Sequence, residues 1–152
     1  MLEIIYEDEW YVAINKPHGL LVHRTKIAEE KKEFAMQMLR DQLNQHVFLI
    51  HRLDRPTSGI LLFAKDSISA QKLSKLFEQK EIKKEYFSIV RGYTENQKTI
   101  THPLKKDGYG EEQEAITTYE TLGKIEIPVE VCRYPTSRYS LLKVKPLSLI
   151  HI

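Results

Sequence analysis

The chain has 152 residues, of which 41% are hydrophobic and 29% charged, proportions that are ordinary for a globular domain. Lys and Arg number 23 against 21 Asp and Glu, so the net charge of +2 does not by itself indicate a nucleic-acid-binding protein. The single cysteine excludes an internal disulfide and argues against a Cys/His zinc site. The N-terminal residues have no apolar run of signal-peptide length, and we expect a cytoplasmic monomer without a membrane segment.

The first predicted element is a β-hairpin. Leu2–Tyr6 and Trp10–Asn15 are short β-prone runs joined by the acidic turn 7–9. Lys16-Pro17-His18-Gly19 then breaks the pattern, and we interpret this break as a turn that supports neighbouring structure. The next range, Ala28–Gln45, is rich in helix formers and predicts an amphipathic helix. Its apolar face is formed by Phe34, Met38, Leu39 and Leu43.

The most distinctive stretch lies between two apolar runs. Val47–Ile50 precedes it and Ile60–Ala64 follows it, a pattern typical of two buried strands joined by an exposed turn. This turn carries Asp54 between arginines, and nearby cations favour the ionised form of a carboxyl group. Such a carboxylate on a tight loop can act as a nucleophile or a base. An ordinary charged turn remains the alternative, because structural ion pairs also cluster charges.

A second helix follows the apolar run. Asp66 or Ser67 can cap it, and it is predicted to end near Lys80. Its predicted buried stripe consists of Leu73, Leu76 and Phe77. The lysines elsewhere on it are expected to be solvated, with phosphate binding as the alternative. They are Lys72, Lys75 and Lys80.

The rest of the chain predicts strands. Residues 84–92 alternate like a strand, and residues 93–110 are expected to form a polar, mobile connection. Three further strands are predicted, the second at a sheet edge because it contains Pro128. They are Ala115–Tyr119, Ile125–Tyr134 and Arg138–Lys145.

Two of these stretches resemble the motifs of one enzyme family. His51-Arg52-Leu53-Asp54, with Thr57-Ser58-Gly59 and Ala64-Lys65 after it, resembles the signature of pseudouridine synthases of the RluA superfamily. Lys84, Tyr86, Val90 and Gly92 match the spacing of its second motif. The resemblance implies an α+β fold over residues 1–146, with a mixed, largely antiparallel sheet and flanking helices. It also implies isomerisation of uridine to pseudouridine without a cofactor or a metal.

The resemblance also implies a role for individual residues. Asp54 would be the catalytic residue, and Tyr86 would stack on the target base and help to move protons. Without the resemblance, the better interpretation of Tyr86 would be a half-buried tyrosine of the sheet whose hydroxyl finds any partner. Arg52 would fill the space that the everted base leaves. The implied RNA-binding residues are His51, Arg52, Arg55, Lys83 and Lys84.

Further short matches resemble one branch of the superfamily, which modifies uridine 65 at the base of the T-stem of tRNA. They include Asn15-Lys16-Pro17, Gln45-His46-Val47-Phe48 and Arg133-Tyr134-Pro135-Thr136. The implied partner is therefore tRNA. Two alternatives stay open: a ribosomal-RNA synthase of the same superfamily, and an RNA-binding fragment with impaired catalysis.

The resemblance ends near Pro146. The superfamily continues there with Thr-Gly-Arg-x-His-Gln, whose arginine pairs with the catalytic aspartate. Leu147–Ile152 stands here instead, so we expect residues 147–152 to be an atypical tail of a C-terminally truncated chain. Loss of one partner of a buried ion pair typically costs about 3–5 kcal/mol, which would weaken the active site of this chain alone.

Overall fold

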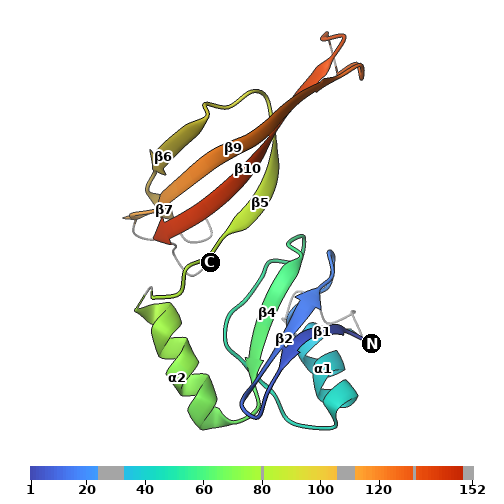
Figure 1. Cartoon of the computed structure of the whole chain (residues 1–152), viewed down its shortest axis with the longest axis vertical. Coiled ribbons are helices and arrows are strands. Elements are labelled where there is room, and N and C mark those ends of the chain that lie inside the picture. Colours follow the sequence, from blue (N-terminus) through green and yellow to red (C-terminus); the bar gives the residue numbers. More distant parts are fainter. Residues whose placement is uncertain (24–32, 80, 106–111, 132, 149–152) are drawn as a thin grey trace. The chain divides into compact units, whose positions relative to one another are not determined.

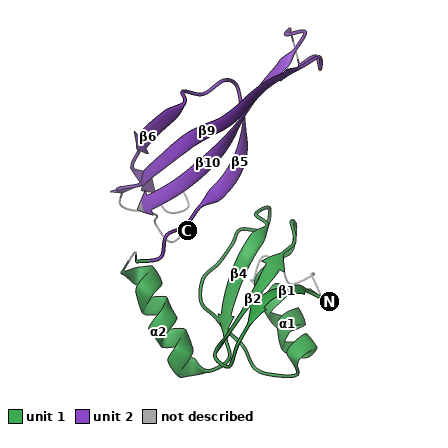
Figure 2. Ribbon diagram, in the orientation of Figure 1, with its two compact units in different colours: residues 1–81 green, residues 82–152 purple. Residues whose placement is uncertain are grey.

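The computed structural model describes residues 1–23, 33–79, 81–105, 112–131 and 133–148. It divides into two compact units, Met1–Glu81 (unit 1) and Ile82–Ile152 (unit 2), each with a sheet of its own (Figure 2). Both described helices belong to unit 1, and the paired strands of both units run antiparallel (Figure 1). The prediction of an α+β fold with a largely antiparallel sheet is confirmed. No described helix is long and apolar enough to cross a membrane.

The sheet of unit 1 has the strand order β1-β2-β4-β3. Its strands are β1 (Glu3–Glu7), β2 (Tyr11–Lys16), β3 (Phe48–Leu49) and β4 (Gly59–Ala64). The predicted hairpin is confirmed as β1 and β2, and Asp8 closes it by accepting backbone N–H groups at 2.8 and 2.6 Å. The predicted strands on either side of Asp54 are confirmed as β3 and β4, which pair with each other.

Alternation along the central strands builds the core of unit 1. Val12 pairs with Phe63 and Ile14 pairs with Leu61, and all of these side chains are fully buried. Helix α1 (Ala35–Leu43) adds the buried Leu39. The helix is tied to β1 because the side-chain amide of Gln42 accepts the N–H of Leu2 and donates to its carbonyl. Residues 28–32 of the predicted helix lie outside the described residues.

Helix α2 (Ser67–Glu78) begins where the sequence predicts. Asp66 caps it by accepting the N–H of Ser69 at 2.8 Å. The predicted buried stripe is wrong in part, because Leu73 and Phe77 are only half-buried and Leu76 is 36% exposed. The helix contacts β3 and β4 at the side of the sheet, which leaves much of its apolar surface uncovered within unit 1. Lys72 and Lys75 are exposed as expected, and Lys80 lies outside the described residues.

The sheet of unit 2 has the strand order β5-β10-β9-β6, and a short pair, β7 and β8, accompanies it. The strands are β5 (Tyr86–Arg91), β6 (Gln97–Thr101), β7 (Leu104–Lys105), β8 (Glu112–Gln113), β9 (Ile116–Ile127) and β10 (Ser137–Ser148). The predicted strands at 84–92 and 138–145 are confirmed as β5 and β10. Because β10 continues to Ser148, the first residues of the predicted tail belong to this strand.

Two sequence predictions for unit 2 are wrong. The connection predicted for residues 93–110 contains β6 and β7, because the exposed run 97–101 pairs with β9 and Leu104–Lys105 pairs with β8. The separate strand Ile125–Tyr134 does not form, because β9 continues through Gly123 to Ile127 along one partner, β10. A register shift of β10 at Leu141 accommodates this continuation.

The core of unit 2 is small. Tyr119, Ser140 and Leu142 are buried on one face of its sheet, whereas Phe87 and Ile89 are 70% and 72% exposed on the other. Ser140 fixes the segment after β5, since its hydroxyl accepts the N–H of Thr94 at 3.1 Å and donates to the carbonyl of Gly92 at 2.9 Å.

Candidate active site

Asp54 lies on an exposed turn that begins from the core of unit 1. Leu53 is buried and anchors the turn, while the next three residues are exposed. The N–H of Thr57 donates to the carbonyl of Asp54 at 3.0 Å and closes the turn. Gly59 then starts β4 with φ of 120°, a conformation that suits glycine. The carboxylate is thus solvent-accessible on a turn with a fixed backbone.

A second turn, residues 16–20, is joined to the Asp54 turn by hydrogen bonds in both directions. The N–H of Gly19 donates to the carbonyl of Arg55 at 2.9 Å, and Nε of Arg55 donates to the carbonyl of Gly19 at 3.2 Å. Nδ1 of His18 donates to the carbonyl of Pro56 at 2.7 Å. These bonds hold the Asp54 turn in one conformation.

Lys16 lies at the end of β2 and is fully buried beneath these turns. Its ammonium donates to the carbonyls of Pro17, Leu20 and Arg55 at 3.1, 2.8 and 3.3 Å. Burial lowers the pKa of the Lys16 amine, and the nearby Asp54 carboxylate opposes this by raising it. The buried ammonium therefore holds the carbonyls of the two turns together, and the Asp54 carboxylate lies close enough to act on it electrostatically.

Lys16 was not among the predicted site residues, although the sequence contains a signal for its burial. Val12 and Ile14 are the inward-facing residues of β2, so the two-residue period of a strand places residue 16 on the same side. A lysine at an inward position needs acceptors for its ammonium. The turn that follows supplies two of them.

His51 occupies the start of the loop with contacts of its own. Its ring stacks on Phe77 of α2, with 4.9 Å between ring centres, and its Nε2 accepts the N–H of Leu62 at 3.2 Å. The predicted RNA-binding residue His51 therefore connects the loop to α2 and β4. Arg52 and Arg55 are exposed, as a contact with a charged ligand requires.

The other predicted site residues lie in unit 2. Tyr86 is the first residue of β5, is half-buried and pairs with Val144, while Lys83 is exposed and Lys84 half-buried just before it. Between them, Glu85 accepts hydrogen bonds from Lys143 and Lys145, both at 3.1 Å, and these lower the pKa of the Glu85 carboxyl. Asp54 and Tyr86 belong to different units, so their cooperation at one site remains a prediction.

The geometry around Asp54 suits a reaction that needs one ionised carboxylate. The carboxylate is exposed, the backbone of its turn is fixed by hydrogen bonds, and the buried ammonium of Lys16 lies nearby. Among the described residues, no group of three His, Cys, Asp or Glu side chains has the arrangement of a metal-ion site.

Comparisons with known proteins identify the family to which the chain belongs. The family model described as RNA pseudouridylate synthase matches residues 10–148. The chain is 50% identical over 156 residues to the tRNA pseudouridine synthase C of Haemophilus influenzae, covering 96% of this chain and 65% of that protein. It is 45% identical over 156 residues to the protein of the same name from Vibrio cholerae, covering 96% and 64%. This chain therefore spans less than two thirds of the length of these relatives.

Solved structures agree on the fold. The human RNA Pseudouridylate Synthase Domain Containing 1 protein superimposes with a TM-score of 0.77 at 20% identity, over 99% of this chain and 61% of that chain. The human Domain Containing 4 protein gives 0.69 at 22% identity, over 97% and 60%. The match of the family model over nearly the whole length decides the assignment. This chain belongs to the RNA pseudouridylate synthase family.

Proposed function

We propose that this chain is part of a tRNA pseudouridine synthase, that residues 1–146 belong to its catalytic domain, and that residues 147–152, of which the first two extend β10, are an atypical tail. The relatives named tRNA pseudouridine synthase C support the substrate class. The observation that carries the proposal is the exposed Asp54 on a turn that the buried Lys16 supports. The proposed target is uridine 65 at the base of the T-stem. The enzyme acts as a cytoplasmic monomer without cofactor or metal.

The reaction is an isomerisation. The N1–C1′ glycosidic bond breaks, the uracil turns, and a bond forms between C5 and C1′. C5 loses a proton and N1 gains one, so neither an oxidant nor water is consumed. A base in a stem must first leave the helix, at a cost of a few kcal/mol. Asp54 attacks or stabilises the reacting nucleoside while the glycosidic bond is broken.

The other residues bind and position the RNA. Tyr86 covers the everted base and assists proton transfer, and Arg52 occupies the space left in the stack. Arg55, Lys83 and Lys84 contact phosphates, which positions the RNA without reading its sequence. His51 is proposed at the RNA surface as well, where its stacking on Phe77 fixes the start of the Asp54 loop.

Tritium release tests the proposed reaction. A tRNA transcript labelled at C5 of its uridines loses tritium to water when pseudouridine forms, and primer extension after carbodiimide treatment locates the modified residue. We expect the 152-residue chain to release tritium from tRNA, with the modification at uridine 65. Release only from a ribosomal-RNA transcript would favour the ribosomal alternative. RNA binding without release from either transcript would contradict a catalytic role for this chain.

A further inference from the structure

The hairpin formed by β9 and β10 extends beyond the other strands of unit 2 (Figure 1). β5 ends at Arg91 opposite Tyr139, and Tyr139 in turn pairs with Ile125. Past this point β9 and β10 pair only with each other among the described residues, as far as the bridge between Val131 and Tyr134. At roughly 3.3 Å per residue, the six steps from Ile125 to Val131 reach at most about 20 Å. We call residues 126–131 and 133–138 the hairpin arm.

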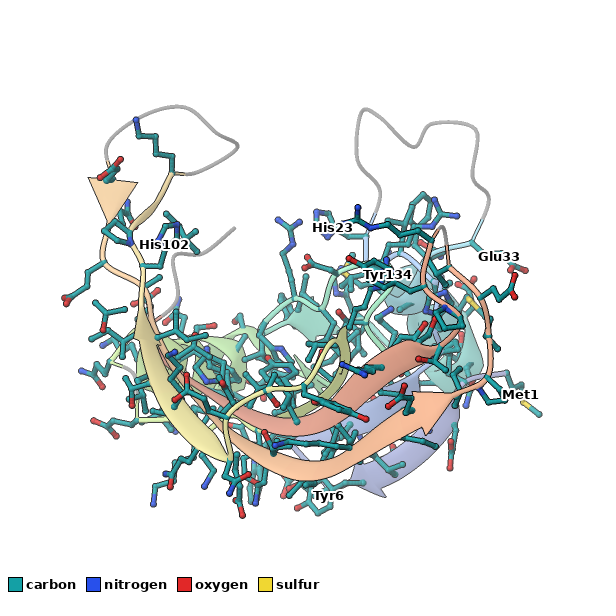
Figure 3. The ribbon with its side chains drawn as sticks, turned by 90° about the horizontal axis from the view of Figure 1, so that it is seen from above. Met1, Tyr6, His23, Glu33, His102 and Tyr134 are labelled. Atoms are coloured by element: carbon teal, nitrogen blue, oxygen red, sulfur yellow. The ribbon has the colours of Figure 1, made fainter. Side chains whose placement is uncertain are left out.

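Two arginine–tyrosine pairs lie on this arm and at its base. The guanidinium carbon of Arg133 is 5.3 Å from the centre of the Tyr134 ring, and that of Arg138 is 5.3 Å from the centre of the Tyr93 ring. Tyr134 and Tyr93 are 53% and 49% exposed. Figure 3 shows Tyr134 at the end of unit 2 opposite His102, which follows β6. Exposed aromatic rings with arginines over them offer both a stacking surface and cationic donors.

Glu126 holds the base of the arm in place. Its carboxylate accepts hydrogen bonds from the hydroxyls of Thr136 and Tyr93, the latter at 3.2 Å, and pairs with Nε of Arg138 at 3.3 Å. The bond from Thr136, with that from Arg138, lowers the pKa of Glu126 and keeps it ionised at neutral pH. The second Tyr–Arg pair is therefore preorganised, and Tyr134 lies only two residues before Thr136.

The chemistry of the arm fits RNA better than a protein partner. Arg138 is neutralised by Glu126, whereas Arg133 forms no ion pair with the described carboxylates and keeps its charge for a phosphate. Along β9, Ile125 and Ile127 lie on the face opposite Glu126, so the Arg–Tyr face has no continuous apolar patch. Aromatic rings stack on unpaired bases, and arginine binds phosphate with several N–H donors.

We propose that the hairpin arm is a second RNA-binding surface, on which Tyr134 stacks on an unpaired base of the RNA and Arg133 binds an adjacent phosphate. The proposal rests on the proposed function, because it takes the RNA substrate as the ligand. In this proposal the hairpin arm binds RNA, and it is far in sequence from the Asp54 turn. The arm therefore contributes to substrate affinity and leaves the chemical step unchanged.

The proposal is tested by measuring how tightly a tRNA transcript binds to the full 152-residue chain. Kd is obtained by fluorescence anisotropy at several salt concentrations. The double variant Arg133→Ala with Tyr134→Ala should raise Kd at least about tenfold and reduce the slope of log K against log salt by about 1. Tyr134→Phe keeps the ring and should bind like the unsubstituted chain. Lys98→Ala is the control elsewhere in unit 2: Lys98 is exposed on β6 but pairs with Glu95, so its loss should change Kd less than about twofold.

The possible results separate this proposal from the proposed function. Equal Kd values for the double variant and Lys98→Ala, or no tRNA binding by the unsubstituted chain, would overturn the arm proposal. Weakened binding by the double variant supports it, even if the unsubstituted chain releases no tritium and the proposed reaction fails. Unchanged far-UV circular dichroism and thermal midpoint of the double variant show that it has folded, as expected for exposed side chains.

Discussion

Replacing Lys16 by methionine tests whether the buried ammonium holds the two turns together. Methionine has nearly the same length, so the substitution removes three hydrogen bonds and the charge while filling most of the space. The carbonyl of Arg55 keeps the N–H of Gly19, but those of Pro17 and Leu20 lose this donor. At about 1–1.5 kcal/mol for each of the two carbonyls that lose their donor, the free energy of unfolding of unit 1 should fall by about 2–3 kcal/mol.

Trp10 is the only tryptophan and lies in unit 1, so its fluorescence reports the unfolding of this unit by urea. The predicted loss corresponds to a fall of the urea midpoint by about 1–2 M. Lys75→Met is the matched control, because Lys75 is exposed on α2 and its replacement should change the free energy of unfolding by less than about 0.5 kcal/mol. Equal midpoints for Lys16→Met and Lys75→Met would refute the role assigned to Lys16.

Three further substitutions test other parts of the account. Ser140→Ala removes the bonds to Gly92 and Thr94 and should destabilise unit 2 by about 1–3 kcal/mol, measured by hydrogen exchange of β5 and β10 amides; the exposed Ser88→Ala should not. His51→Phe keeps a ring on Phe77 but removes the acceptor for Leu62, so unit 1 should lose about 1 kcal/mol by urea unfolding, and an unchanged midpoint would count against the His51–Leu62 bond. The hydroxyl and N–H of Ser69 lower the pKa of Asp66, so the stability that this carboxylate gives α2 is present above its ordinary value of 3.8 and is lost as the pH falls through the folded value. Asp66→Ala should therefore lower the thermal midpoint at pH 7 and flatten its acid dependence, and parallel acid curves for variant and parent would contradict this.

The elements that the sequence predicted correctly carry local signals. The hairpin of β1 and β2 has an acidic turn whose Asp8 accepts the next N–H groups, and α2 has Asp66 at its N-cap. The turn at Asp54 was predicted because apolar runs flank a polar break. Each of these depends only on residues a few positions apart, which a single sequence displays.

The features that the sequence did not predict depend on distant partners. β6 is exposed along its whole length and becomes a strand only because β9 offers backbone partners. A glycine such as Gly123 is typical of the end of a strand. β9 nevertheless continues through it, because β10 pairs with β9 on both sides of that residue. Lys16 was expected in a turn that supports neighbouring structure, but its burial depends on carbonyls up to 39 positions away. The apolar residues of α2 were predicted to be buried, but this helix contacts mainly β3 and β4 of the sheet, and part of its apolar surface stays exposed.

The most direct test of the central claim is a comparison of Asp54→Asn with Asp41→Asn, which removes an exposed carboxylate from α1. The two variants should bind tRNA with the same Kd as the parent chain. In single-turnover tritium release, Asp41→Asn should match the parent, and Asp54→Asn should release no tritium above background. Release by Asp54→Asn at the rate of the parent would contradict the assignment of Asp54 as the catalytic residue.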